Sequence, residues 1–133
     1  MRGVDTNILV RFLTGDDLRQ SKRVYALFKA AEAAKSELFV STPVLLELIW
    51  VLESAYEVDR EDLIDALSSL ILMPIFVFQN ERGVQQFVRA ARDTSVDLSD
   101  LLIAYTCLDA GCEETLTFDK KAARHDLFAL LRA

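Results

Sequence analysis

The sequence predicts an α/β fold in which a short, mainly parallel sheet of about four to five strands is flanked by helices. Short apolar or β-branched runs alternate with longer stretches of helical periodicity, which is the pattern of such folds. Each short run is followed by residues that favour the start of a helix. The length of 133 residues suits one ordinary domain, so we expect a single domain over residues 1–133.

The predicted elements follow from these patterns. We expect strands at residues 2–4, 38–41, 75–78 and 115–117. We expect helices at residues 7–13, 17–34, 43–56, 60–72, 81–94, 100–110 and 120–124. Side chains that can cap these helices are Thr42, Asp59, Asn80 and Ser99, and Gly111 favours a C-terminal stop.

The apolar stretches indicate a soluble protein. The longest uninterrupted one, residues 70–78, contains Pro74 and is far shorter than the ~20 residues of a membrane-spanning helix. Asp5 stands so near the start that no apolar segment of a signal peptide precedes it, and we therefore expect a cytoplasmic location. Apolar residues make up 52% of the chain, and we expect part of this surplus in a subunit interface.

Histidine and cysteine restrict the chemistry that the chain can perform. His125 is the only histidine, so zinc sites and histidine-based triads lack their parts. Cys107 and Cys112 are five residues apart, which fits neither a CxxC site nor a good disulfide, and we expect both to be reduced. A catalytic site in this chain would therefore be built from oxygen ligands.

The net charge of −6 argues against a broad basic surface for nucleic acid. This objection weakens if many of the acids gather in one cation-binding pocket. The basic side chains left to meet phosphates elsewhere would then be Arg11, Lys22, Arg23, Lys120, Lys121 and Arg124.

Two aspartates follow predicted strands. Asp5 comes after the first strand and Asp119 comes after the strand at residues 115–117. In open parallel sheets the ligand site lies beyond the carboxyl ends of the strands, so these two carboxylates are candidates for one shared site. Helix capping is the alternative for each, because Asp is a leading N-cap residue.

Three further acids are candidates for the same site. Glu47 interrupts an apolar run and shares a helical face with Val44 and Trp50, so we expect a cation or a basic partner beside it, unless it lies on a narrow wet strip of the helix. Asp100 opens a predicted helix and Asp97 stands three residues earlier, where the helix dipole alone would also favour acids.

A divalent cation would remove the repulsion between such clustered carboxylates. Ligation by oxygen atoms alone selects hard ions, so Mg²⁺ or Mn²⁺ is expected rather than zinc.

Four motifs stand in order along the whole chain: Asp5-Thr6-Asn7, the run from Thr42 to Glu47, the run from Asp97 to Ala104, and Thr117-Phe118-Asp119-Lys120-Lys121. Each motif is weak alone, but together, at these separations, they resemble the pattern of PIN-domain ribonucleases. VapC toxins of VapBC toxin–antitoxin pairs are the commonest single-domain members of that family.

The resemblance implies roles for these residues. The acidic pocket and its metal ligands would be Asp5, Glu47, Asp100 and Asp119, with Asp5 and Asp100 as the firmest ligands. The side chains of Asn7, Thr6 and Thr117 would orient carboxylates or water, with Asp97 in reserve. The residues that could steer the phosphate backbone are Lys120, Lys121 and Arg124, although exposed charges on a terminal helix are an equal alternative.

The resemblance also implies hydrolysis of RNA phosphodiester bonds, a homodimer, and a small antitoxin protein that blocks the pocket. Two alternatives stay open: a catalytically silent protein-binding module of the same fold, and a PIN-domain RNA-processing nuclease outside a toxin–antitoxin pair. Other α/β enzymes fail at named residues. A haloacid-dehalogenase-like phosphatase needs a second Asp where Asn7 stands, a response-regulator receiver needs an Asp where Gln79-Asn80 stands, and the glycines form no P-loop.

Overall fold

The computed structural model describes residues 1–132 and divides into two compact units, residues 1–79 and residues 80 onwards. The first unit contains β1 (Arg2–Gly3), α1 (Thr6–Thr14), α2 (Leu18–Ala34), β2 (Leu38–Val40), α3 (Thr42–Ser54), α4 (Arg60–Ile71) and β3 (Phe76–Phe78). The second contains α5 (Glu81–Ala91), α6 (Leu98–Asp109), β4 (Thr115–Thr117), the 3₁₀ helix η1 (Ala122–Arg124) and β5 (Phe128–Leu130). No helix among residues 1–132 is long and apolar enough to cross a membrane.

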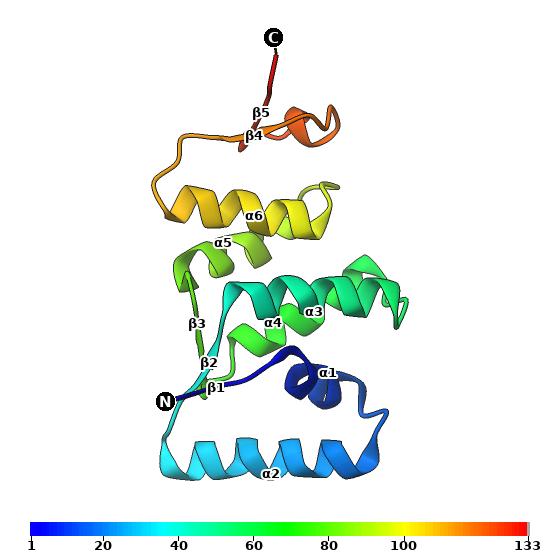
Figure 1. The fold of residues 1–133 in the computed structure, drawn as a ribbon, viewed down its shortest axis with the longest axis vertical. Helices are drawn as coiled ribbons and strands as arrows, with labels where there is room; N and C mark the ends of the chain where they lie inside the picture. The colour runs from blue at the N-terminus through cyan, green and yellow to red at the C-terminus, as the bar shows by residue number, and fades with distance from the viewer. Residues whose placement is uncertain (133) are drawn as a thin grey trace. The chain divides into compact units, whose positions relative to one another are not determined.

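The sheet of the first unit is parallel and has the order β1-β2-β3 (Figure 1). Arg2 pairs with Leu38, and Leu38 pairs with Phe76, so the three strands run in one direction. The ladder continues past β1, because the N–H of Val4 donates to the carbonyl of Phe39 at 3.0 Å. Asp5 therefore lies at the carboxyl edge of this sheet, as the sequence predicts.

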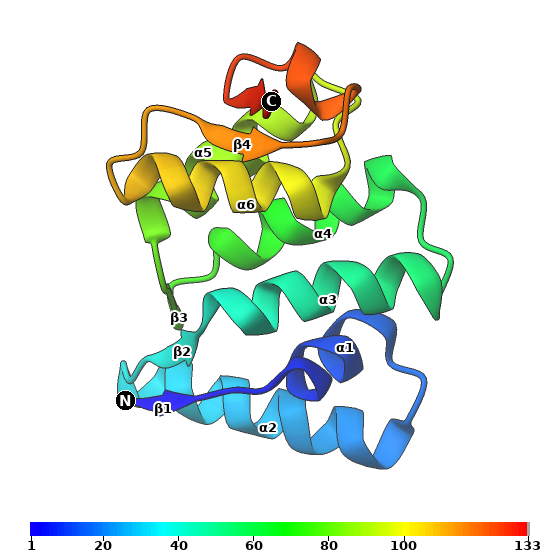
Figure 2. The ribbon, with the colours of Figure 1, turned by 45° about the horizontal axis from the view of Figure 1, so that its top comes forward.

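Helix α1 lies between α2 and α3 (Figure 2). Its residues Leu9 and Val10 are buried, as are Leu48 and Ile49 of α3, because each helix turns one apolar side toward the other elements. This packing forms the core of the first unit and fixes the start of α1, where Asp5 stands.

A polar network braces the turn between α1 and α2. The Nε atom of Arg11 donates to Gln20 Oε1 at 2.6 Å, and its Nη1 donates to Asp16 Oδ1 at 3.3 Å. The hydroxyl of Tyr56 donates to Asp16 Oδ2 at 2.6 Å, and this bond is the main reason that the pKa of Asp16 is lowered. Arg11 is thus committed to the fold rather than left for a ligand.

In the second unit, α5 packs closely against α6 (Figure 2). A Cβ atom at Gly83 of α5 would come within 3.0 Å of the carbonyl oxygen of Tyr105 in α6, so the close approach depends on glycine there. The parallel pair β4 and β5 completes this unit, with Thr115 opposite Phe128. Asp119 follows the carboxyl end of β4.

The predicted α/β class with parallel strands is confirmed, but the arrangement of the sheet differs from the expectation of one sheet. Hydrogen bonds join the strands into one set of three and one set of two. The strand Phe128–Leu130 was not predicted from the sequence, because the run Leu127-Phe128-Ala129-Leu130-Leu131 has neither strand alternation nor turn signals. Only its pairing with β4 makes it a strand.

Several helix boundaries also differ. The side chain of Ser41, not Thr42, caps α3, and Asp97, not Ser99, caps α6, because each helix begins before the expected residue. Asn80 occupies the cap position of α5 in a left-handed conformation without a side-chain capping bond. The helix expected at residues 120–124 is a 3₁₀ turn, since Asp119 Oδ1 accepts the N–H groups of both Lys121 and Ala122 and tightens it.

A matched pair of leucine variants tests the core of the first unit. Leu48 is fully buried in α3, whereas Leu72 is 80% exposed. We expect Leu48→Ala to lower the free energy of unfolding by about 2–5 kcal/mol, because it removes buried apolar atoms and leaves a cavity. Leu72→Ala should change it by less than about 0.5 kcal/mol. Urea unfolding followed by circular dichroism measures both, and equal effects would contradict the described core.

Candidate functional site

Three carboxylates of the second unit share one pocket. Asp97, Asp100 and Asp119 line a hollow of about 270 Å³ together with Lys121. The start of α6 supplies the first two acids, and the turn after β4 supplies the third. The structure therefore brings together Asp100 and Asp119, as the sequence predicts, and places Asp97 in the same pocket.

Backbone groups hold two of these acids in place. Asp97 Oδ2 accepts the N–H of Asp100 at 3.2 Å and so caps α6. Asp119 Oδ1 accepts the N–H of Lys121 at 2.8 Å, while the N–H of Asp119 itself donates to Thr117 Oγ1 at 3.0 Å. The capping bond that the sequence left as the alternative for Asp119 is present, and Asp97 makes one as well. Capping does not exclude a ligand role, because a carboxylate has two oxygens and each cap uses one of them.

Asp100 is different, because no hydrogen bond or ion pair described in residues 1–132 compensates its charge. It is half-buried, and no hydrogen bond to its side-chain oxygens is described within residues 1–132. Burial raises the pKa of Asp100, and the charges of Asp97 and Asp119 raise it further. A bound cation would stabilise the ionised carboxylate in this position. Unlike Asp97 and Asp119, Asp100 is distinguished by its electrostatic surroundings and not by a capping bond.

Asp5 has a comparable cap in the first unit. Its Oδ1 accepts the N–H of Ile8 at 3.3 Å, which begins α1. Asp5 and Asn7 are exposed and line a groove of about 400 Å³ that also includes Arg23, while Thr6 between them is buried. Asp5 and Asn7 can therefore meet a ligand at this groove, whereas the side chain of Thr6 supports the helix from inside.

The argument that Glu47 needs a partner in an apolar environment is wrong. Glu47 is exposed, and so is Trp50, with 65% of its surface accessible. The buried side of α3 is formed by Leu45, Leu48 and Leu52, about half a turn away, so Glu47 lies on the wet strip that the sequence left as the alternative. The proposed ligand role of Glu47 therefore depends only on the motif Thr42 to Glu47 that resembles the family pattern.

The chemical type of the available ligand atoms suits a hard divalent cation. The acids offer only oxygen atoms, and each capping bond leaves one oxygen of its carboxylate available. No three acidic, histidine or cysteine side chains of residues 1–132 converge as closely as the ligands of a metal ion would. Asp5 and Glu47 belong to the first unit and Asp100 and Asp119 to the second, so the convergence of all four stays a prediction.

Comparison with known proteins identifies the family. The family model of the PIN domain matches residues 4–127, which is nearly the whole chain. The chain belongs to the PIN-domain family. It is also similar to a VapC ribonuclease of Aquifex aeolicus, with 22% identity over 121 residues that cover 91% of this chain and 89% of that protein. The family resemblance that the four motifs carry is confirmed.

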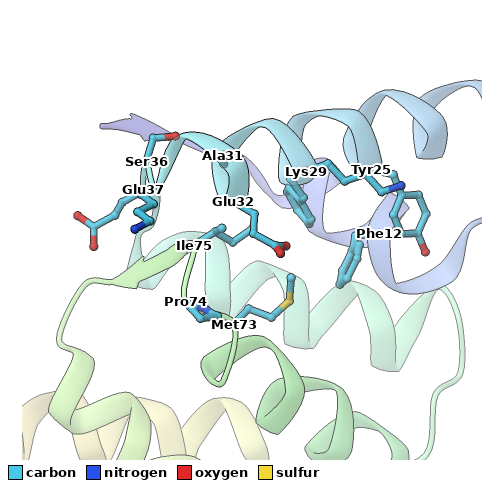
Figure 3. A pocket seen from close by; sticks show the side chains of 12 residues that line it. Phe12, Tyr25, Lys29, Ala31, Glu32, Ser36, Glu37, Met73, Pro74 and Ile75 are labelled. Carbon is cyan, nitrogen blue, oxygen red and sulfur yellow. The ribbon is translucent and has the colours of Figure 1, made fainter.

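The largest hollow described in this PIN-domain chain is a separate, apolar cavity of about 550 Å³ in the first unit. Figure 3 shows Phe12 and Tyr25 at one end of it and Ser36 and Glu37 at the other, with Met73 between them. None of the motif acids lines it. Its chemistry is that of side-chain packing, so the polar hollows beside the acids are the better candidates for the site.

The basic side chains after Asp119 divide between two hollows. Lys121 lines the acidic pocket, whereas Lys120 and Arg124 line a second one together with Arg132. Sequence reasoning grouped the first three and missed Arg132. The missing signal was β5, because pairing with β4 is what returns the chain end to this turn.

The raised pKa of Asp100 gives a pH-dependent stability. An acid whose pKa is higher in the folded than in the unfolded protein opposes folding wherever it is ionised, that is, above its unfolded-state pKa of about 3.9. We therefore expect Asp100→Asn to unfold at higher urea concentration than the original protein at pH 7 in chelator, and the difference to vanish below the unfolded-state pKa.

The control for this measurement is Asp126→Asn, which removes the same charge from an exposed loop position. It should shift the urea midpoint little at either pH. A lower midpoint for Asp100→Asn than for the original protein at pH 7 would show that the charge of Asp100 is compensated within the fold.

Proposed function

We propose that this PIN-domain protein is a metal-dependent ribonuclease that hydrolyses RNA phosphodiester bonds and acts as the toxin of a type II toxin–antitoxin pair, inhibiting translation and growth. The observation that carries the proposal is Asp100, a half-buried carboxylate beside Asp97 and Asp119 in one pocket. The name of the Aquifex aeolicus relative, a VapC ribonuclease, supports the reaction class.

The chain's own oxygen atoms would hold Mg²⁺ or Mn²⁺. Asp100 is the first ligand that we assign, with Asp119 and Asp97 beside it in the same pocket. We assign Asp5 and Glu47 as further ligands because they stand in the motifs that resemble the family pattern. On the same ground, the residues that would orient carboxylates or water are Asn7, Thr6 and Thr117. The ion, when bound, lowers the pKa of water and offsets the charge that develops on the phosphate.

The remaining steps belong to side chains of the protein. No histidine stands in the motifs, so a carboxylate must receive the proton of the attacking water. Asp97 and Asp119 lie in the same pocket, and the oxygen that each capping bond leaves unused can accept this proton. Lys121 lines the same pocket and can attract the phosphate group electrostatically.

We propose further that residues 1–133 act as one domain, in the cytoplasm, as a homodimer bound by a small antitoxin. The family model spans both compact units, which supports a single functional domain. Several large apolar side chains are exposed to solvent. Trp50 and Phe118, with 65% and 78% of their surfaces accessible, support an interface with a second protein.

Purified protein tests the nuclease. We expect cleavage of total RNA in Mg²⁺ or Mn²⁺, no cleavage in chelator, and a loss on the order of 100-fold or more for Asp100→Asn, because an essential ligand is removed. Sequencing of the RNA ends measures the sites and rates. Asp109→Asn, which removes an exposed carboxylate from the other end of α6, should cleave normally.

Two results would contradict the nuclease. Cleavage that persists in chelator would exclude metal dependence. Metal-dependent cleavage that is equal in Asp100→Asn and Asp109→Asn would show that the acidic pocket is not the active site. A purified protein that neither cleaves RNA nor binds either ion by calorimetry would favour the silent binding module.

The partners are tested separately. We expect light scattering to give twice the 15.0 kDa of one chain at micromolar concentration, because a dimer would cover exposed apolar surface. We expect production of the protein to arrest growth of a bacterial host and co-production of a small protein encoded beside it to restore growth. A monomer would count against the homodimer, and unaffected growth against the toxin.

A further inference from the structure

A second polar hollow of the 80–132 unit is lined by three cations. Lys120, Arg124 and Arg132 surround a space of about 430 Å³, together with Ala123 and Leu130. No acidic side chain lines it. The sign of its charge is therefore opposite to the net charge of −6 of the whole chain.

The elements that hold Asp119 also hold these cations. Lys120 directly follows Asp119, and Arg124 ends η1, the turn that the Asp119 carboxylate tightens. Arg132 follows the last strand bond, in which the N–H of Leu131 donates to the carbonyl of Thr117 at 2.8 Å. Backbone hydrogen bonds therefore hold Arg124 and the immediate neighbours of Lys120 and Arg132, and these bonds bring the three cations to one hollow.

The charges of this hollow are not balanced within the protein. No ion pair or side-chain hydrogen bond is described for Lys120, Arg124 or Arg132 in residues 1–132, where the salt bridge that is described joins Arg11 and Asp16 in the other unit. Like charges brought together repel one another. A bound anion would relieve this repulsion and satisfy the unused donors.

The anion that fits this donor set is a phosphate group. An arginine side chain presents a planar fork of N–H donors that matches two phosphate oxygens, and a lysine adds a point charge. Two arginines and one lysine can therefore surround one phosphate. Ala123 and Leu130 give the hollow an apolar wall, against which a sugar can pack.

We propose that Lys120, Arg124 and Arg132 form a phosphate-binding subsite that takes a backbone phosphate of RNA next to the bond that is cut. The choice of RNA rests on the proposed nuclease function. One turn of chain separates the two hollows: Asp119, Lys121 and Ala122 line the acidic pocket, and Lys120, Ala123 and Arg124 line the basic one. An RNA strand that crosses this turn places one phosphate at the acids and another at the cations.

The experiment measures RNA binding apart from cleavage. A fluorescein-labelled single-stranded RNA of twelve nucleotides is titrated with full-length Asp100→Asn protein by fluorescence anisotropy, over a series of salt concentrations. The double variant Arg124→Ala/Arg132→Ala is compared in the same background with Arg124→Lys/Arg132→Lys. The control is Arg89→Ala, an exposed arginine of α5 outside the hollow. Thermal melting of every variant shows that each is folded.

We expect the double alanine variant to raise the Kd about tenfold or more and to reduce the slope of log K against log salt by about 0.7 for each phosphate that the protein no longer neutralises. The lysine variants should keep most of the slope, because they keep the charge, and Arg89→Ala should match its parent. Inorganic phosphate and a mononucleotide, added as competitors, distinguish the source of the phosphate. We expect both to displace the RNA only at concentrations far above the Kd of the RNA.

Unchanged Kd and salt slope in the double alanine variant would overturn the subsite. Displacement by inorganic phosphate at the same concentration as by RNA would show a site for the free anion and overturn the RNA assignment. The nuclease function is judged separately, from cleavage by the protein with Asp100 intact. The subsite can therefore fail while cleavage persists, or stand while cleavage is absent.

Discussion

Asp5, Asp97 and Asp119 each accept backbone N–H groups at the start of a helix or turn, and the rest of the site depends on this use of acids as caps. The cap fixes the direction of the carboxylate without any further side chain. It also leaves the second oxygen unused, because one oxygen suffices for the backbone donor. Folding and ligand binding therefore need the same residues and do not compete for the same atoms.

Asp100 shows the cost of such a site. The turn that makes Asp97 a cap places Asp100 one turn into the same helix, half-buried and next to two other negative charges. The fold provides no cation for it among the described side chains of its pocket other than Lys121. A protein selected for stability alone would have an uncharged residue at this position, and an uncompensated charge of this kind is typical of functional sites.

The distribution of charge bears on the objection that a chain of net charge −6 is poorly suited to RNA. Net charge describes the field at a distance, whereas binding depends on the charges that line a particular hollow. The turn after β4 separates the two signs, with acids on one side and three cations on the other. An acidic protein can in this way present a local basic surface beside an acidic pocket.

The sequence by itself determined the class of fold and the family, and it indicated the candidate acids of the site. Alternation of short apolar runs with helical periodicity is a local property, and so is the position of an acid after a strand, which is why both could be read before any tertiary structure was known. The same local reasoning failed for Glu47, whose surroundings depend on which side of α3 the core covers. It failed for β5 and Arg132 as well, since a strand without its own pattern exists only through its partner β4. Tertiary structure alone decided these points, because burial and pairing join residues that are distant in the chain, and no local pattern records which of them will meet.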